Sequence, residues 1–256
     1  MIQYPLPNVY VCAPKRSHRL KWATASHLRY RLMNPFDVLR DSLYFFKRNL
    51  KQIVQLCLPL VIFEALLQQV VDRSTEPDSF PGISVIVGLL VYPLYTAALI
   101  LFLDARSRGE SPRNRDLLAM SASLWPRFAL LTALNTLLIL LGLSLYFLPG
   151  IWLMVALAFG EYLLVLRGMA PLAAMKASLR LTRGHFLRIL VCILCVMGPL
   201  WVLKGVTLQV YPEPQNPVIS LLIDSAHSFL QLFTSVVLFR LFMLISDVPE
   251  KVDRPL

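Results

Sequence analysis

The chain has 256 residues, of which 57% are hydrophobic, and it carries a formal net charge of +10. Soluble domains are about 45–50% apolar. Here the excess is gathered in continuous runs of about 20 residues, the length of a helix that crosses a bilayer. Because these runs do not alternate in polarity, they exclude a membrane β-barrel. The basic charge flanks the apolar runs, so it is typical of a membrane protein and argues against nucleic-acid binding.

Residues 1–32 differ from the rest of the chain. They hold basic residues and no acidic one: Lys15, Arg16, Arg19, Lys21, Arg29 and Arg31. No apolar core of a secretory signal is present, although the composition also fits a transit peptide. We expect this arm to be disordered or to lie upstream of a true start at Met33. Peptides from residues 1–32 in the natural protein would contradict the second reading.

Six apolar runs predict one all-α membrane domain over residues 33–246, followed by a polar tail at 247–256. The predicted spans are residues 50–71, 83–103, 128–147, 151–166, 186–206 and 218–245. Between the third and fourth spans, Pro149-Gly150 predicts a tight turn. The chain is therefore expected to be a polytopic membrane protein with six transmembrane helices.

Segments with an apolar stripe precede the first, third and fifth spans. The first is residues 35–49, the second is the weakly amphipathic stretch 116–124 within the basic region 104–127, and the third is the basic segment that holds Arg167, Lys176, Arg180, Arg183 and Arg188. Such segments are typical of interfacial helices. In the last of them, Lys176, Arg180 and Arg183 are candidate ligands for lipid headgroups. The plainer reading is that these bases only anchor and orient the helices.

The connections between spans alternate in charge. Those before span one, between spans two and three, and between spans four and five are rich in Lys and Arg, and the others are acidic, short or neutral. The positive-inside rule then places both termini in the cytoplasm.

A weak internal repeat joins residues 35–53 to residues 171–189 without a gap. The matched pairs are Pro35 with Pro171, Arg40 with Lys176, Ser42 with Ser178, Leu43 with Leu179, Lys47 with Arg183, and Ile53 with Ile189. The stretch AMSASL, residues 119–124, echoes AMKASL, residues 174–179. The pattern favours an interfacial helix plus a two-span hairpin, used three times. Convergence of basic amphipathic segments is the alternative.

Two stretches carry a family likeness: PGIWLMVALAFGEYLLVLRGMAPLAAMKASLRLTRGHFLRI, from Pro149, and VVLFRLFMLI, from Val236. They resemble the YciC family, bacterial inner-membrane proteins that also carry an uncharacterised-protein-family label. The likeness runs from Met33 to about Ile245. It implies an integral inner-membrane protein of a Gram-negative bacterium and implies no enzyme activity. The chain is also loosely similar to the membrane domain of some glycerophosphodiester phosphodiesterases, whose catalytic domain has no counterpart here.

Ionisable residues inside spans are costly and mark functional sites by default. Glu64 lies in the middle of span one, where its carboxyl group is either neutral or faces a wet cavity. Glu161 and Arg240 lie at similar depths in spans four and six and are expected to pair. Lys204 and Asp224 could form a second pair near the periplasmic ends of spans five and six. Separate snorkelling to the interface is the alternative for the bases.

Other motifs indicate neither catalysis nor a cofactor. Cys192 and Cys195 share one helix face, but no His or acid stands near them in sequence, so we interpret them as small apolar residues. The chain lacks a Gly-rich phosphate loop, GxSxG and HExxH. We therefore assign no catalytic, cofactor-binding or metal-binding residue.

These patterns favour a non-enzymatic envelope protein of the bacterial inner membrane. Its expected partners are membrane lipids, anionic ones included, and other membrane proteins, with no nucleic acid. The alternative is a transporter or channel for a small solute, using Glu64, Glu161 and Arg240 along its path. A membrane-embedded lipid enzyme fits less well, because no nucleophile stands paired with a base.

Overall fold

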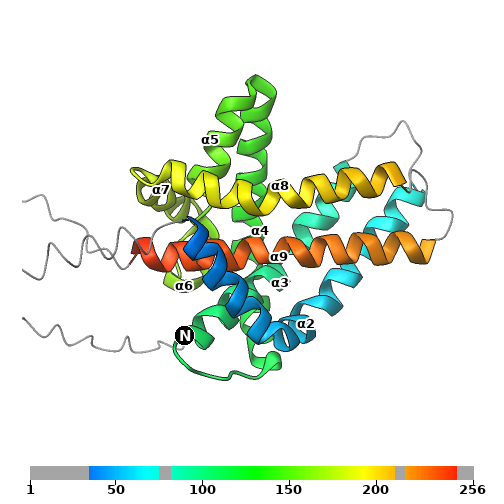
Figure 1. Cartoon of the computed structure of the whole chain (residues 1–256), viewed down its shortest axis with the longest axis horizontal. Coiled ribbons are helices and arrows are strands. Elements are labelled where there is room, and N and C mark those ends of the chain that lie inside the picture. Colours follow the sequence, from blue (N-terminus) through cyan, green and yellow to red (C-terminus); the bar gives the residue numbers. More distant parts are fainter. Residues whose placement is uncertain (1–34, 75–81, 211–216, 247–256) are drawn as a thin grey trace, which may run out of the picture.

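A computed structural model describes residues 35–74, 82–210 and 217–246. The predictions for residues 1–32 and for the tail at 247–256 lie outside these ranges. Within the described residues the chain forms helices and no strand. The helices are α2 (Pro35–Ser74), α3 (Gly82–Ser107), α4 (Asn114–Leu145), α5 (Phe147–Leu157), α6 (Gly160–Arg167), α7 (Pro171–Thr182), α8 (Phe186–Val210) and α9 (Pro217–Ser246) (Figure 1).

The expected class, an all-α polytopic membrane protein, is confirmed. Six segments are long and apolar enough to cross a membrane. Five are the single helices α2, α3, α4, α8 and α9, and the remaining one, Phe147–Arg167, is α5 and α6 taken together. Helices are stable in a lipid bilayer because they form their backbone hydrogen bonds internally.

The helices run further than the apolar runs alone indicated. α2 continues as one helix of 40 residues from Pro35 through the first span, and α4 begins at Asn114, well before the third span. Only α7 is separate from the span that follows it. There the chain turns at Gly184, whose φ of +87° suits glycine and ends the helix.

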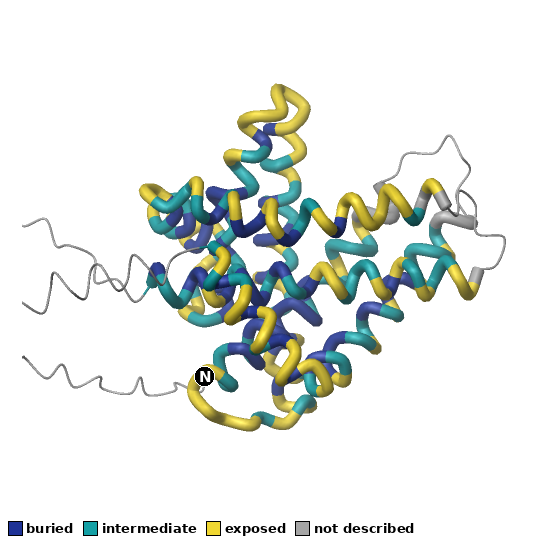
Figure 2. Tube along the Cα trace, viewed as in Figure 1, coloured by how far each residue is buried: buried dark blue, intermediate teal, exposed yellow. Residues whose placement is uncertain are grey.

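Most helices pack against a neighbour in the chain, and the last packs against the first. α2 contacts α3, α3 contacts α4, α4 contacts α5, α6 contacts α7, α8 contacts α9, and α9 returns against α2. α3 also contacts α6 and α9, so it lies at the centre. Its residues Ala97, Ala98, Leu99 and Ile100 are fully buried, in agreement with the dark-blue interior of Figure 2.

The predicted turn at Pro149-Gly150 is wrong in position. The chain reverses at Tyr146, whose extended backbone (φ −162°, ψ 151°) separates α4 from α5. Pro149 falls in the first turn of α5, where a backbone N–H has no intrahelical partner to lose. Gly150 instead lets α5 approach α4. The hairpin formed by the two helices projects from the other helices, and its tip is exposed (Figures 1 and 2).

This close approach predicts a steric effect at Gly150. A Cβ atom there would lie 2.9 Å from the backbone nitrogen of Leu143, closer than real Cβ contacts allow. Gly150→Ala should therefore lower the free energy of unfolding by about 1–3 kcal/mol, measured by thermal unfolding in detergent. The control is Gly198→Ala, because no atom lies within 4 Å of its added Cβ. That change should leave stability equal or slightly higher, and an equal loss in both variants would contradict the argument.

Candidate functional site

The helix of the fourth span is interrupted, and a side chain of α7 forms hydrogen bonds with the backbone groups at the interruption. α5 ends at Leu157 and α6 begins at Gly160. The Ser178 hydroxyl, fully buried, donates to the Ala156 carbonyl at 2.7 Å and accepts from the Phe159 N–H at 3.2 Å. Backbone groups away from water need such partners. The position of α7 is thus tied to the break in span four.

Ser178→Ala should destabilise the protein by about 1–3 kcal/mol, because it leaves both backbone groups without that partner. Chemical or thermal unfolding in detergent measures the loss. Ser121→Ala is the matched control, since Ser121 is equally buried but its hydroxyl bonds only to Leu118 of its own helix. A loss for Ser121→Ala as large as that for Ser178→Ala would mean that the hydrogen bonds between Ser178 and span four do not stabilise the protein.

The break also places Glu161 in the first turn of α6, facing α3. The Tyr92 hydroxyl of α3 lies 3.4 Å from each carboxyl oxygen of Glu161. The ring of Tyr92 packs edge-on against that of Tyr95, with 5.6 Å between the centroids. The Tyr95 hydroxyl in turn lies beside the carboxyl group of Glu64 on α2. Two tyrosines of α3 therefore stand between the two carboxyl groups of the bundle interior.

Glu64 is the more enclosed of the two acids, with a relative exposure of 9%. Gln68 donates to its Oε1 at 3.3 Å. Its Oε2 is buried and accepts no hydrogen bond from the residues that the structure describes. The sequence singled out both acids but missed Tyr92 and Tyr95, whose spacing of three on a span was the available signal.

The structure corrects the expected pairing of Glu161 with Arg240. Arg240 instead contacts Asp41 of α2, with 3.7 Å between nitrogen and oxygen and both side chains about half-exposed. The reason is orientation on the helices: Glu161 faces α3, whereas Arg240 faces α2. Sequence depth alone did not reveal that Asp41, expected in an interfacial helix, would lie beside span six.

Lys204 and Asp224 do not form the expected ion pair either. Both side chains are exposed, and within the described ranges the ion pairs are Arg40–Asp37, Arg108–Asp104 and Arg240–Asp41. Asp224 instead accepts from Ser220 of its own helix at 3.3 Å. A side chain as long as that of Lys204 reaches water from a helix end without a partner.

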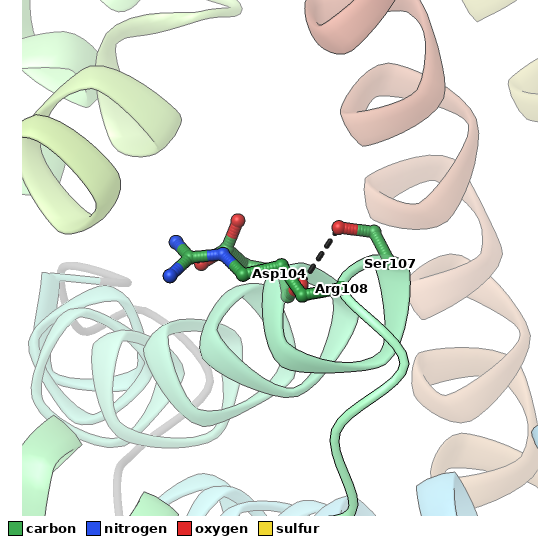
Figure 3. A network of polar contacts seen from close by, with 3 residues as sticks. All are labelled: Asp104, Ser107 and Arg108. Carbon is green, nitrogen blue, oxygen red and sulfur yellow. Dashed lines mark hydrogen bonds and ion pairs between the residues drawn. The ribbon is translucent and has the colours of Figure 1, made fainter. Parts of the chain in front are cut away.

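Polar contacts gather at the C-terminal end of α3, which lies against α2. Arg106 donates to the Asn49 side chain at 3.0 Å. Asp104 pairs with Arg108, and the Ser107 hydroxyl donates to the Asp104 carbonyl at 2.7 Å (Figure 3). The sequence did not single out this network.

On α7, the predicted headgroup ligands Lys176, Arg180 and Arg183 are all exposed. None of the three forms an ion pair with another residue that the structure describes. The opposite face of the helix is buried: Ala174, Met175, Ser178 and Thr182.

His185 lies in the turn between α7 and α8, and its Nδ1 is buried without a hydrogen-bond partner among the described residues. Burial, and secondly the nearby Arg188, lower the pKa of the His185 side chain. The imidazole is therefore neutral near pH 7 and adds no charge to those of α7.

The cysteine motif does not assemble a larger site. Cys192 is buried and Cys195 exposed, and both are free thiols. Among the described residues, no group of three His, Cys, Asp or Glu side chains is placed to hold a metal ion.

Comparison with known proteins gives distant relatives. The chain is 24% identical over 189 residues to a UPF0259 membrane protein of Yersinia pestis (strain Pestoides F), covering 74% of this chain and 73% of the relative. A UPF0259 membrane protein of Yersinia pseudotuberculosis serotype O:3 (strain YPIII) matches with the same values. No family model matches the chain, and no solved structure does. The relatives support a place among uncharacterised bacterial membrane proteins, and none has an enzymatic name.

Proposed function

We propose that this protein is a non-enzymatic, YciC-like protein of the bacterial inner membrane that binds anionic lipid at its cytoplasmic face through α7. The alternating charge of the connections supports an orientation with both termini in the cytoplasm. The observation that carries the proposal is the placement of three exposed bases, with Lys176 and Arg180 on α7 and Arg183 directly after its last residue.

Because these bases are held at one place, they can bind a particular lipid headgroup, beyond a general attraction to an anionic membrane surface. A base near an anionic surface contributes about 1 kcal/mol, and three bases within eight residues act together. α7 is held rigidly, because Ser178 bonds to span four and Met175 packs against the bundle. The backbone that carries these charges therefore does not have to be ordered when a lipid headgroup binds.

Replacing the three bases of α7 by Gln should remove co-purified anionic lipid from the full-length protein. Native mass spectrometry with lipids retained should show a loss in anionic-lipid affinity of about tenfold or more. The matched control replaces Arg113, Arg115 and Arg127 by Gln, which removes the same charge from exposed positions outside α7.

Lipid retained unchanged in the α7 variant would reject the proposal, as would equal loss in both variants. A reporter fused to Leu256 tests the orientation in the same cells. Activity characteristic of the periplasm would place α7 on the wrong face of the membrane.

A second candidate function is transfer of protons or small cations through the interior. The observation that favours it is the row formed by Glu64, Tyr95, Tyr92 and Glu161, because acidic side chains inside a membrane mark proton and ion pathways. Oε2 of Glu64 has no hydrogen-bond partner within the described chain, so it is available to hold a cation.

For this candidate, we expect proteoliposomes with an internal pH-sensitive dye to dissipate an imposed pH gradient. Glu64→Gln and Glu161→Gln should each return the rate to that of protein-free liposomes. Glu110→Gln, a similar change at an exposed position, should leave the rate at the wild-type value. No wild-type flux, or full flux in both interior variants, excludes the row as a pathway.

A further inference from the structure

A cavity of about 320 Å³ lies between α2, α3 and α9, within the volume range of small-molecule sites. Its lining combines charged and serine side chains with aromatic ones: Asp41, Ser42, Ser107 and Arg240, with Tyr44, Phe45 and Phe239. It is separate from the exposed face of α7 and from the row of groups between Glu64 and Glu161. Neither proposed function uses it.

Ser42 points to a missing ligand in this cavity. Its side chain is 2% exposed, and its hydroxyl has no hydrogen-bond partner among the residues described. Such a buried hydroxyl is costly unless something satisfies it. In the internal repeat, Ser42 corresponds to Ser178, whose hydroxyl is satisfied twice by span four. In the first copy the serine therefore borders a cavity, whereas in the second copy the serine bonds to the backbone of span four.

A charged ligand could replace either partner in the ion pair between Arg240 and Asp41. Arg240 and Asp41 are 3.7 Å apart and about half-exposed, and ion pairs of this kind contribute little to stability. Each can therefore take a ligand group of opposite charge at small cost. A phosphate would replace the carboxylate beside Arg240, and an ammonium would replace the guanidinium beside Asp41.

The hydroxyl groups of Ser42 and Ser107 add one hydrogen-bond donor and one acceptor to the cavity. Ser42 has a hydroxyl proton to donate. Ser107 already donates its proton to the Asp104 carbonyl, so its oxygen is left as an acceptor. The cavity thus offers two donors, Arg240 and Ser42, and two acceptors, Asp41 and Ser107.

We propose that this cavity binds the headgroup of a phospholipid that carries a primary amine, such as phosphoethanolamine. The phosphate oxygens accept from Arg240 and Ser42, and the ammonium donates to Asp41 and Ser107. The aromatic side chains of Phe45 and Phe239 pack against the glycerol and the start of the acyl chains. This site selects a zwitterionic headgroup, whereas the bases of α7 select anionic ones, so either proposal can fail without the other.

The test is a lipid titration of the full-length protein by native mass spectrometry. Phosphatidylethanolamine is compared with phosphatidylglycerol, which keeps the phosphate but lacks the amine, and with inorganic phosphate as the free anion. The titration uses the variant with Lys176, Arg180 and Arg183 replaced by Gln, because these bases would otherwise bind phosphatidylglycerol. This protein should prefer phosphatidylethanolamine. Arg240→Gln should weaken its binding about tenfold, as expected for loss of a charge-assisted contact. Asp41→Asn should remove the preference over phosphatidylglycerol while keeping phosphate-dependent binding.

Ser42→Ala supplies a control for folding, because it removes an unpaired hydroxyl and should leave the unfolding temperature unchanged or higher. It should nevertheless weaken phosphatidylethanolamine binding several-fold. Arg240→Lys, which keeps the positive charge, should retain part of the affinity. Equal binding of both lipids by the protein that lacks the bases of α7 overturns the proposal. So does unchanged selectivity in Asp41→Asn or unchanged phosphatidylethanolamine affinity in Ser42→Ala. Binding of inorganic phosphate alone would reduce the cavity to a free-anion site.

Discussion

The two hydrogen bonds of Ser178 are the interaction on which the rest of the arrangement depends. Span four needs a partner for the backbone groups at its break, because a membrane interior supplies no water for them. Ser178 provides that partner from α7. The break turns Glu161 toward the tyrosines of α3, and the bridge fixes α7 with its bases outward. One hydroxyl group thus positions both the interior acid and the exposed charges.

The internal repeat gains support from burial, which follows the same register in both copies. At a constant offset, these pairs are buried in each copy: Val38 and Ala174, Ser42 and Ser178, Phe46 and Thr182, Ile53 and Ile189, Leu56 and Cys192, and Glu64 and Leu200. A basic amphipathic segment alone does not explain why the match extends deep into the span. The copies differ where function is proposed. Glu64 replaces an apolar residue, and Arg48 continues the helix where Gly184 ends it.

The sequence was sufficient for the six spans, because continuous apolar length is a direct measure of what crosses a bilayer. It was insufficient for the ion pairs. Depth along a span follows from residue number, but the direction in which Glu161 or Arg240 points depends on how the helices are rotated against one another. Tyr92 and Tyr95 were missed because aromatic residues are common in membrane spans. Only the structure shows that their hydroxyl groups lie beside the carboxyl groups of Glu161 and Glu64. The turn was misplaced because Pro149 is tolerated within the first turn of a helix.

We propose that the cytoplasmic ends of these helices bind lipid headgroups at defined places. The most direct measurement is a structure determined in nanodiscs of phosphatidylethanolamine and phosphatidylglycerol, with an antibody fragment bound to aid alignment. We expect headgroup density between Arg240 and Asp41 and a second headgroup against the bases of α7. A cavity filled by water or closed by side chains, together with bare bases on α7, would contradict this proposal.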